Sequence, residues 1–508
     1  EMQAHRWLLV VIVCFLLFVF WQVLDAPRNP VVQDEEVNEW EKLPAVSEDT
    51  VYDHYAVVFD LGSSGSRANI FTWTRNKFSH CAVANGGGFH NLKPMEDGTK
   101  KIKPGVSQLS STPTRIGESL APLWSFLQEK IPSDAQGDTP VFMFATAGLR
   151  VIAEAENEKL YDDDDSDSNV ILEPDDDDYS KGSVAKILNH LRSFVTNETP
   201  FQLLQNDHIR VLMGQEEGLF DFLTVQQLLR LHPYAKMSGS GEDWNTQIFD
   251  PAITTPVTLF PICTIDLGGA STQIAFETSS ERYTHNITEF TKAPYKAQYP
   301  CIFTHSFLDY GINRVRELHH LSLFSEASTA EDPCSFSGHE YKVSIDQQEY
   351  SLLGTGSFVK CKKKIRVMFD TYLGPSECSQ PPCAMHKVQM PPLPTDGAKI
   401  IAFDHAYRVA SLFSSRGYET LDELFDKVQA ELENPWDVVR GSAQFSSLSD
   451  TELEKLPFEG LYVASLLYYG YGFSNNIPVG FADTVDQQSL SWALGALVHN
   501  VYQLCERS

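Results

Sequence analysis

The first chemically suggestive residues are an aspartate and a run of Gly and Ser that follow an apolar segment. Residues 57–67 read VVFDLGSSGSR, which predicts a strand that delivers Asp60 into a loop of small residues. Gly tolerates backbone angles that other residues resist, so such a loop can turn its N–H groups inward as an anion nest. With Arg67 as a fixed cation, the stretch indicates a phosphate cradle beside a carboxylate, although an ordinary turn fits the same pattern.

The chain repeats this pattern once. Residues 264–276 read TIDLGGASTQIAF, again an apolar strand, an Asp (Asp266), a Gly-rich turn and a further strand. Two strand–Asp–Gly loops far apart in sequence predict two similar half-domains that face each other. The phosphates of a nucleotide would then be bound between the two loops.

Two other stretches place polar groups at strand ends. Residues 140–150 read PVFMFATAGLR, where Thr146 either points its hydroxyl into a cleft or caps the following helix. Residues 210–220 read RVLMGQEEGLF, which predicts a helix that opens with Glu216 and Glu217. Acidic residues there are often only dipole partners, but the position between the two loops favours a catalytic role for one of them.

Length and charge narrow the class of protein. The 508 residues suffice for two core-forming domains, and a hydrophobic share of 42% is typical of a globular protein. The chain has 39 Lys and Arg against 68 Asp and Glu, a net charge of −29. This charge argues against general nucleic-acid binding, which needs a basic surface. A phosphate substrate stays possible because a local pocket with a divalent cation can be positively charged although the whole chain is negative.

The N-terminal region predicts attachment to a membrane. Residues 7–24 form an apolar run without charge, near the length that spans a bilayer. We expect a type II signal anchor with a short cytosolic end (1–6) and a polar luminal stem (25–53); a cleaved signal peptide is the alternative. Asn197 and Asn286 fit the glycan acceptor pattern.

Five stretches in order resemble the apyrase family, the nucleoside triphosphate diphosphohydrolases, and within it the Golgi guanosine/uridine diphosphatases. They read VVFDLGSSGSR (57–67), ATAGLR (145–150), GQEEG (214–218), DLGGASTQIAFE (266–277) and SWALGA (491–496). The segment CSQPPCAMHKVQMPPL (378–393) also resembles the Golgi enzymes.

The resemblance implies an α/β fold with two RNase-H-like lobes of the actin/hexokinase-like superfamily and a central cleft. Lobe I would comprise residues 54–205 plus 482–508, and lobe II residues 206–481. The family would pair Cys334 with Cys361 and Cys378 with Cys383, whereas the partners of Cys81 and Cys301 stay open. Asp309 stands where many relatives have a cysteine.

The resemblance also assigns roles within the cleft. Glu217 would be the general base that activates water, with Glu216 as runner-up, and Ser271 and Gln273 would help to hold that water. Asp60 and Asp266, with Thr146 nearby, would hold Ca²⁺ or Mg²⁺ mostly through water. Tyr407 and Tyr471 would stack on the nucleotide's base, unless they are core residues. The phosphate-binding residues would be Gly62, Ser63, Ser64, Gly65, Ser66, Arg67, Gly268, Gly269, Ala270 and Ser271.

The predicted function is metal-dependent hydrolysis of the terminal phosphate of UDP, GDP or a triphosphate in the Golgi or another secretory lumen. Three alternatives are an ATP/ADP-hydrolysing apyrase at the cell surface, a sugar kinase or exopolyphosphatase on the same fold, and a non-catalytic luminal scaffold. A kinase would need an acceptor site with its own base, and no such motif is present. A scaffold would be expected to have lost a key residue, and none is lost.

Overall fold

The computed structural model describes residues 51–76, 92–161, 182–231, 261–278, 302–324, 329–345, 348–371, 381–394, 398–414, 416–485 and 487–506. The account below concerns the unit that runs from Tyr52 to the C-terminus. Within the described ranges, no helix is both long and apolar enough to cross a bilayer. The predicted anchor and nearly all of the stem lie outside these ranges, as do Asn286, Cys81, Cys301 and Cys378.

The first sheet carries the first Asp loop. Its strands follow the order β3-β2-β1-β4-β5, and β1 pairs in parallel with β4, which pairs in parallel with β5. The fully buried strand β4 has apolar residues on both faces, as expected for a parallel strand covered on each side. The elements are β1 (Val51–Leu61), β2 (Ser66–Asn76), β3 (Lys93–Ile102), β4 (Val141–Ala145), β5 (Ile209–Val211), α2 (Ile116–Lys130), α3 (Ala147–Tyr161) and α4 (Gly182–Glu198).

The second sheet repeats this plan around the second Asp loop. Its order is β13-β14-β12-β6-β7-β8, with β6, β7 and β8 antiparallel and with β12 parallel to both β6 and β14. In each sheet, the Asp-bearing strand lies between a hairpin partner and a parallel strand, in agreement with two similar half-domains. The strands are β6 (Ile262–Leu267), β7 (Ser271–Glu277), β8 (Ile302–Leu308), β12 (Lys399–Asp404), β13 (Tyr418–Thr420) and β14 (Pro478–Phe481).

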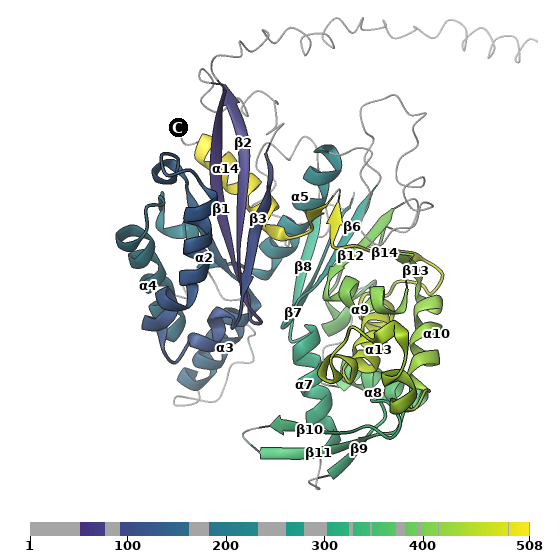
Figure 1. Cartoon of the computed structure of the whole chain (residues 1–508). Helices are drawn as coiled ribbons and strands as arrows, with labels where there is room; N and C mark the ends of the chain where they lie inside the picture. The colour runs from purple at the N-terminus through teal and green to yellow at the C-terminus, as the bar shows by residue number, and fades with distance from the viewer. Residues whose placement is uncertain are drawn as a thin grey trace, which may run out of the picture. The chain divides into compact units, whose positions relative to one another are not determined.

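Two helices pack together between the sheets (Figure 1): α5 (Gly214–Leu231) and α14 (Trp492–Glu506). One hydrophobic cluster joins their apolar faces to residues of both sheets, including Phe144 of β4 and Phe403 of β12. Because this helix pair packs against both sheets, it fixes how the two Asp loops face each other.

The first sheet includes β5, which ends at Val211, beyond the predicted lobe boundary at residue 205.

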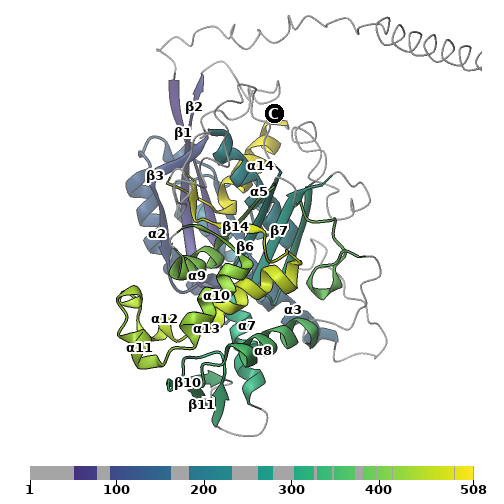
Figure 2. The same cartoon turned by 90° about the vertical axis from the view of Figure 1, so that its right-hand side faces the viewer.

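The remaining helices cover the second sheet and extend away from it (Figures 1 and 2). A disulfide joins Cys334, after β9, to Cys361 of α8, as the family resemblance implies. Cys383 is also disulfide-bonded, and its expected partner Cys378 lies outside the described residues. The elements are α7 (Ile312–Leu323), β9 (Thr329–Asp332), β10 (Glu340–Ile345), β11 (Gln348–Gly354), α8 (Phe358–Thr371), α9 (His405–Phe413), α10 (Leu421–Leu432), α11 (Trp436–Arg440), α12 (Asp450–Leu453), α13 (Leu456–Ser465), a π-helix (Leu466–Tyr471), β15 (Thr484–Val485) and β16 (Gln488–Ser489).

The contact between α5 and α14 depends on Gly495. A Cβ atom there would lie 2.0 Å from the backbone oxygen of Phe220, so we expect Gly495→Ala to destabilise the protein by about 1–3 kcal/mol through overpacking. Chemical denaturation measures this difference. Gly137→Ala is the matched control, because a Cβ at Gly137 would meet nothing within 4 Å. Equal effects of the two substitutions would contradict the close packing of the helices.

Candidate active site

The two Asp loops face each other across a cleft. A Cβ atom on Gly269 of the second loop would lie 3.1 Å from Oγ of Ser63 in the first loop. Most of the predicted site residues line this one cleft, which confirms that the fold brings both loops together. These residues are Asp60, Gly62, Ser63, Ser64, Gly65, Arg67, Thr146, Glu217, Asp266, Gly268, Gly269, Ala270 and Ser271.

Glu217 lies in the first turn of α5, within a hydrogen-bonded group that spans the cleft. Arg150 of α3 donates from Nη2 to Glu217 Oε2 at 2.8 Å and to Ser271 Oγ at 3.3 Å. Gln273 Nε2 lies 3.1 Å from the same Glu217 oxygen and 2.8 Å from Ser271 Oγ. Gly218 permits this approach, because a Cβ there would lie 2.6 Å from Thr304 Oγ1. The group joins α3, α5 and β7.

Glu216 has a different set of partners. Arg210 of β5 donates to both of its carboxylate oxygens at 2.5 and 2.6 Å, and the backbone N–H of Met213 donates at 3.0 Å. Glu216 is buried and does not line the cleft. A bidentate pair of this kind fixes both oxygens, so Glu216 stabilises the start of α5 rather than facing a ligand.

The cleft concentrates negative charge. Burial is the main cause that raises the pKa of Asp60 to about 6, against the opposing effect of Arg67. Burial also raises the pKa of Glu217, partly offset by Arg150. Burial, reinforced by neighbouring carboxylates, raises the pKa of Asp221 and Asp266 well above the usual range. Placing carboxylates together in a poorly hydrated site disfavours their charged forms.

Sequence reasoning assigned no role to several residues of this site. Arg150 lies within the ATAGLR stretch, and its long reach to Glu217 depends on the tertiary structure. Asp221 follows Glu217 by one helical turn, a spacing that places both on one helix face and was a usable signal. Asp404 ends β12 as Asp60 and Asp266 end their strands, and its backbone adopts φ 50°. Lys101 and Asp404 both line the cleft.

Asp404 keeps a low pKa although it faces the same acidic cleft. Burial alone would raise the pKa of this carboxyl group, but the charge of His405 and a hydrogen bond from it hold the value below the usual range. The Nδ1 atom of His405 lies 3.0 Å from Asp404 Oδ2. Asp404 is thus a stably charged group at the edge of the site.

Four predicted residues are not among those that line the cleft; one of them, Gln273, still hydrogen-bonds to Glu217 and Ser271. Ser66 is fully buried at the start of β2, so its hydroxyl does not reach the phosphate site. Tyr471 is also fully buried, its hydroxyl lies 2.9 Å from Thr272 Oγ1, and its ring packs against Phe307. This ring offers no face to a ligand, because the core of the second lobe surrounds it. Tyr407 is half-buried on α9, and its stacking role stays a prediction.

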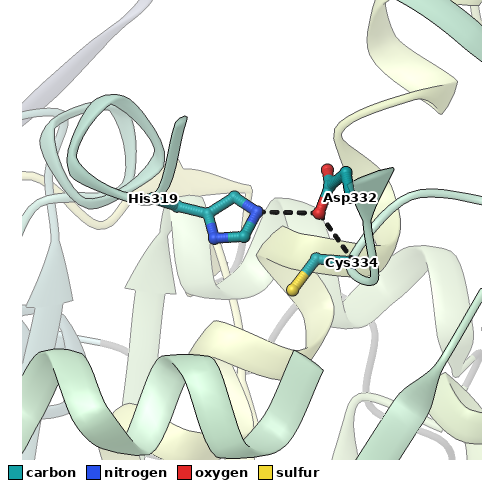
Figure 3. Close-up of side chains that lie close together, drawn as sticks. All are labelled: His319, Asp332 and Cys334. Atoms are coloured by element: carbon teal, nitrogen blue, oxygen red, sulfur yellow. Dashed lines mark hydrogen bonds and ion pairs between the residues drawn. The ribbon is translucent and has the colours of Figure 1, made fainter. Parts of the chain in front are cut away.

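A second cluster of metal-ligand side chains does not line the cleft. The ligand atoms of His319, Asp332 and Cys334 lie within 4.8 Å of one another (Figure 3). The sulfur of Cys334 is bonded to Cys361, so it cannot serve as a thiolate ligand. Burial alone would raise the pKa of Asp332, but His319 and hydrogen bonds, including one from the Tyr341 hydroxyl, lower it to about 2. This cluster is a structural network.

One protein-family model matches nearly the whole of the described chain. The model of the GDA1/CD39 (nucleoside phosphatase) family matches residues 46–169 and 180–505. The chain belongs to the GDA1/CD39 family. This result confirms the predicted resemblance and the prediction of a nucleotide phosphohydrolase.

Several relatives of this GDA1/CD39 protein are similar over most of their length. The nucleoside-triphosphatase ntp-1 of Caenorhabditis elegans is 25% identical over 88% of this chain and 73% of the relative. The nucleoside-diphosphatase mig-23 of the same organism is 24% identical over 93% and 81%. The Golgi apyrase of Schizosaccharomyces pombe is 24% identical over 87% and 74%.

A solved structure supports the fold. The nucleoside triphosphate hydrolases of Neospora caninum align with a TM-score of 0.56 and 14% identity, covering 90% of this chain and 95% of that chain. The α/β class with two mixed sheets is therefore confirmed, whereas the predicted N-terminal membrane helix lies outside the described residues.

The cleft of this GDA1/CD39 protein fits a divalent cation, on which the family depends. Its donors are carboxylate oxygens, which Ca²⁺ and Mg²⁺ prefer. Asp266 Oδ1 is buried and has no hydrogen-bond partner among the described residues. In the described part of the chain, no three cleft carboxylates bring their oxygens within 4.8 Å of one another.

The raised carboxylate pKa values predict a pH dependence of stability in the cation-free protein. Between its usual pKa of 3.8 and the raised value of about 6, Asp60 keeps a proton in the folded state that the unfolded state releases. Stability in EDTA should therefore fall as pH rises through this interval. Thermal unfolding at several pH values measures the fall, which should be smaller in Asp60→Asn. An equal fall in that variant would contradict the assignment.

Proposed function

We propose that this protein hydrolyses the terminal phosphate of nucleoside diphosphates, including UDP and GDP, and of nucleoside triphosphates, with water activated by Glu217. The observation that carries the proposal is the position of the Glu217 group beside two Gly-rich loops that line the same cleft. The names of the relatives support both substrate classes, since one is a nucleoside-diphosphatase and another a nucleoside-triphosphatase.

The two loops would bind the phosphates. Both Gly-rich turns present small residues to the cleft, so a phosphate can approach their backbone N–H groups closely. The hydroxyl groups of Ser63 and Ser64 and the guanidinium group of Arg67 add donors on the side of the first sheet. Because the loops come from opposite sheets, they would hold consecutive phosphates in line with the Glu217 group.

Glu217, Gln273 and Ser271 each have a hydrogen-bonding position that is free to bind a water molecule. Glu217 Oε2 receives the hydrogen bonds from Arg150 and Gln273, whereas no described residue donates to Oε1. Gln273 Oε1 is buried and has no partner among the described residues. Ser271 Oγ accepts hydrogen bonds, which leaves its own proton to be donated. A water at this point would donate to Glu217 and Gln273.

The reaction follows from this placement. The water oxygen attacks the terminal phosphorus, the bond from phosphorus to the bridging oxygen breaks, and Glu217 Oε1 takes the proton of the water. The raised pKa of Glu217 makes it a better base than an exposed glutamate. Asp60 and Asp266, with Thr146 nearby, would hold Ca²⁺ or Mg²⁺. The bound cation would neutralise charge that develops on the leaving phosphate.

We place the activity in the Golgi or another secretory lumen. Relatives named Golgi apyrase support this compartment, and a relative named ectonucleoside triphosphate diphosphohydrolase 1 supports the cell surface as the alternative. Asn197 is exposed at the end of α4, where a glycan would meet no steric obstacle from a buried core.

Glu217→Gln tests the base directly. We expect about a 10²–10⁴-fold loss of kcat in phosphate release from UDP, GDP, ADP and ATP, because the amide cannot take the proton. Glu216→Gln is the matched control, since it changes the adjacent glutamate that Arg210 binds. This control should lower stability and keep most of the activity. Greater loss of kcat in Glu216→Gln than in Glu217→Gln would overturn the assignment.

Arg150→Met tests whether Arg150 positions Glu217. Loss of the hydrogen bond to Glu217 should reduce kcat about 10²-fold, as misplaced catalytic groups do. Arg150 also lowers the pKa of Glu217, so its removal should raise that pKa and move the acidic limb of the pH–rate profile to higher pH. A profile that keeps its position would show that Arg150 does not act on Glu217.

A further inference from the structure

Asp221 is a buried carboxylate at the inner wall of the cleft. It follows Glu217 by one turn of α5, lines the same cleft and is only 2% exposed. Neither Oδ1 nor Oδ2 has a hydrogen-bond partner among the described residues. Leaving both oxygens of a buried carboxylate unsatisfied is costly, so the site needs a group that satisfies them.

Asp221 and Asp266 differ from the neighbouring cleft carboxylates because no basic side chain lies within ion-pair distance of them among the described residues. Glu217 pairs with Arg150 at 2.8 Å, Asp60 lies 4.0 Å from Arg67, and Asp404 lies 3.0 Å from His405. Within the described ranges, neither Asp221 nor Asp266 forms an ion pair.

The other charges around Asp221 increase its need for a counter-ion. Besides burial, four neighbouring carboxylates disfavour the charged form of Asp221. Asp266 has the largest effect among them, followed by Glu217, Asp404 and Asp60. Two neighbouring carboxylates without a counter-ion match the charge of one divalent cation.

We propose that Asp221 contributes, with Asp266, to the divalent-cation site of the cleft. The water molecules around a hard cation supply the hydrogen-bond donors that both Asp221 oxygens lack. This assignment deepens the proposed function, since the cation is the one that hydrolysis would use. It adds Asp221 to Asp60 and Asp266, the two carboxylates already expected to hold the cation, because Asp221 lines the same cleft and has no hydrogen-bond partner among the described residues.

The test is Mn²⁺ binding to the full chain without nucleotide, measured by the loss of the electron paramagnetic resonance signal of free Mn²⁺. We expect Asp221→Asn to weaken binding about tenfold or more, the range seen when groups that support a metal site are removed. Asp221→Ser serves as a second neutral variant if the amide does not fit. The control is Glu277→Gln, a half-buried carboxylate outside the cleft lining, which should bind as the wild type does.

Thermal unfolding gives a second readout. In EDTA, Asp221→Asn should unfold at a temperature no lower than the wild type, because the substitution removes a buried carboxyl group that has no partner among the described residues. Added Mn²⁺ should raise the unfolding temperature of the wild type more than that of the variant. Mn²⁺ affinity within twofold of the wild type in both folded variants would overturn the proposal.

The binding experiment separates this proposal from the proposed reaction. Mn²⁺ binding that depends on Asp221 would support the cation site even if phosphate release were absent. A wild-type protein that binds no Mn²⁺ would overturn the Asp221 assignment, whatever its activity.

Discussion

The contact between Arg150 and Glu217 is the interaction on which the site depends. Arg150 belongs to α3 beside the first sheet, and its guanidinium group reaches both Glu217 on α5 and Ser271 on β7. It also donates to the backbone oxygen of Leu212 at 2.8 Å. One side chain therefore links the glutamate to the second Asp loop and to the backbone between β5 and α5. Two features keep α3, α5 and β7 together at this point. They are the packing of α5 against α14 and the lack of a side chain at Gly218, which lets α5 lie close to β8.

The accumulated negative charge of the cleft is the second constraint. A folded protein gains stability by burying apolar groups, and the same burial penalises the carboxylates at the inner end of the cleft. The protein balances part of this charge with Arg67 and Arg150, and the His405 ring lies at hydrogen-bond distance from Asp404. The remaining charge suits a divalent cation, which in the proposed function would offset the repulsion between a chain with a net charge of −29 and a phosphorylated substrate.

The sequence was informative where a local pattern determines the structure. The two strand–Asp–Gly loops predicted the paired half-domains and the positions of Asp60 and Asp266, because the strand ends and Gly turns are local features. The prediction of Glu217 over Glu216 rested on family position; the structure adds that Arg210 binds both carboxylate oxygens of Glu216. Arg150 and Asp404 reach the site only through tertiary contacts. Tyr471 was misplaced because an aromatic residue suits a core as well as a stacking site.

The most direct test of the account is hydrolysis of a nucleoside diphosphate in water enriched in ¹⁸O, with both products analysed by mass spectrometry. The account predicts that the released phosphate gains one ¹⁸O atom and that the nucleoside monophosphate gains none, because the water beside Glu217 attacks the terminal phosphorus. Label in the nucleoside monophosphate would contradict it, since the attack would then occur at the inner phosphorus and the loops would hold the substrate in another register.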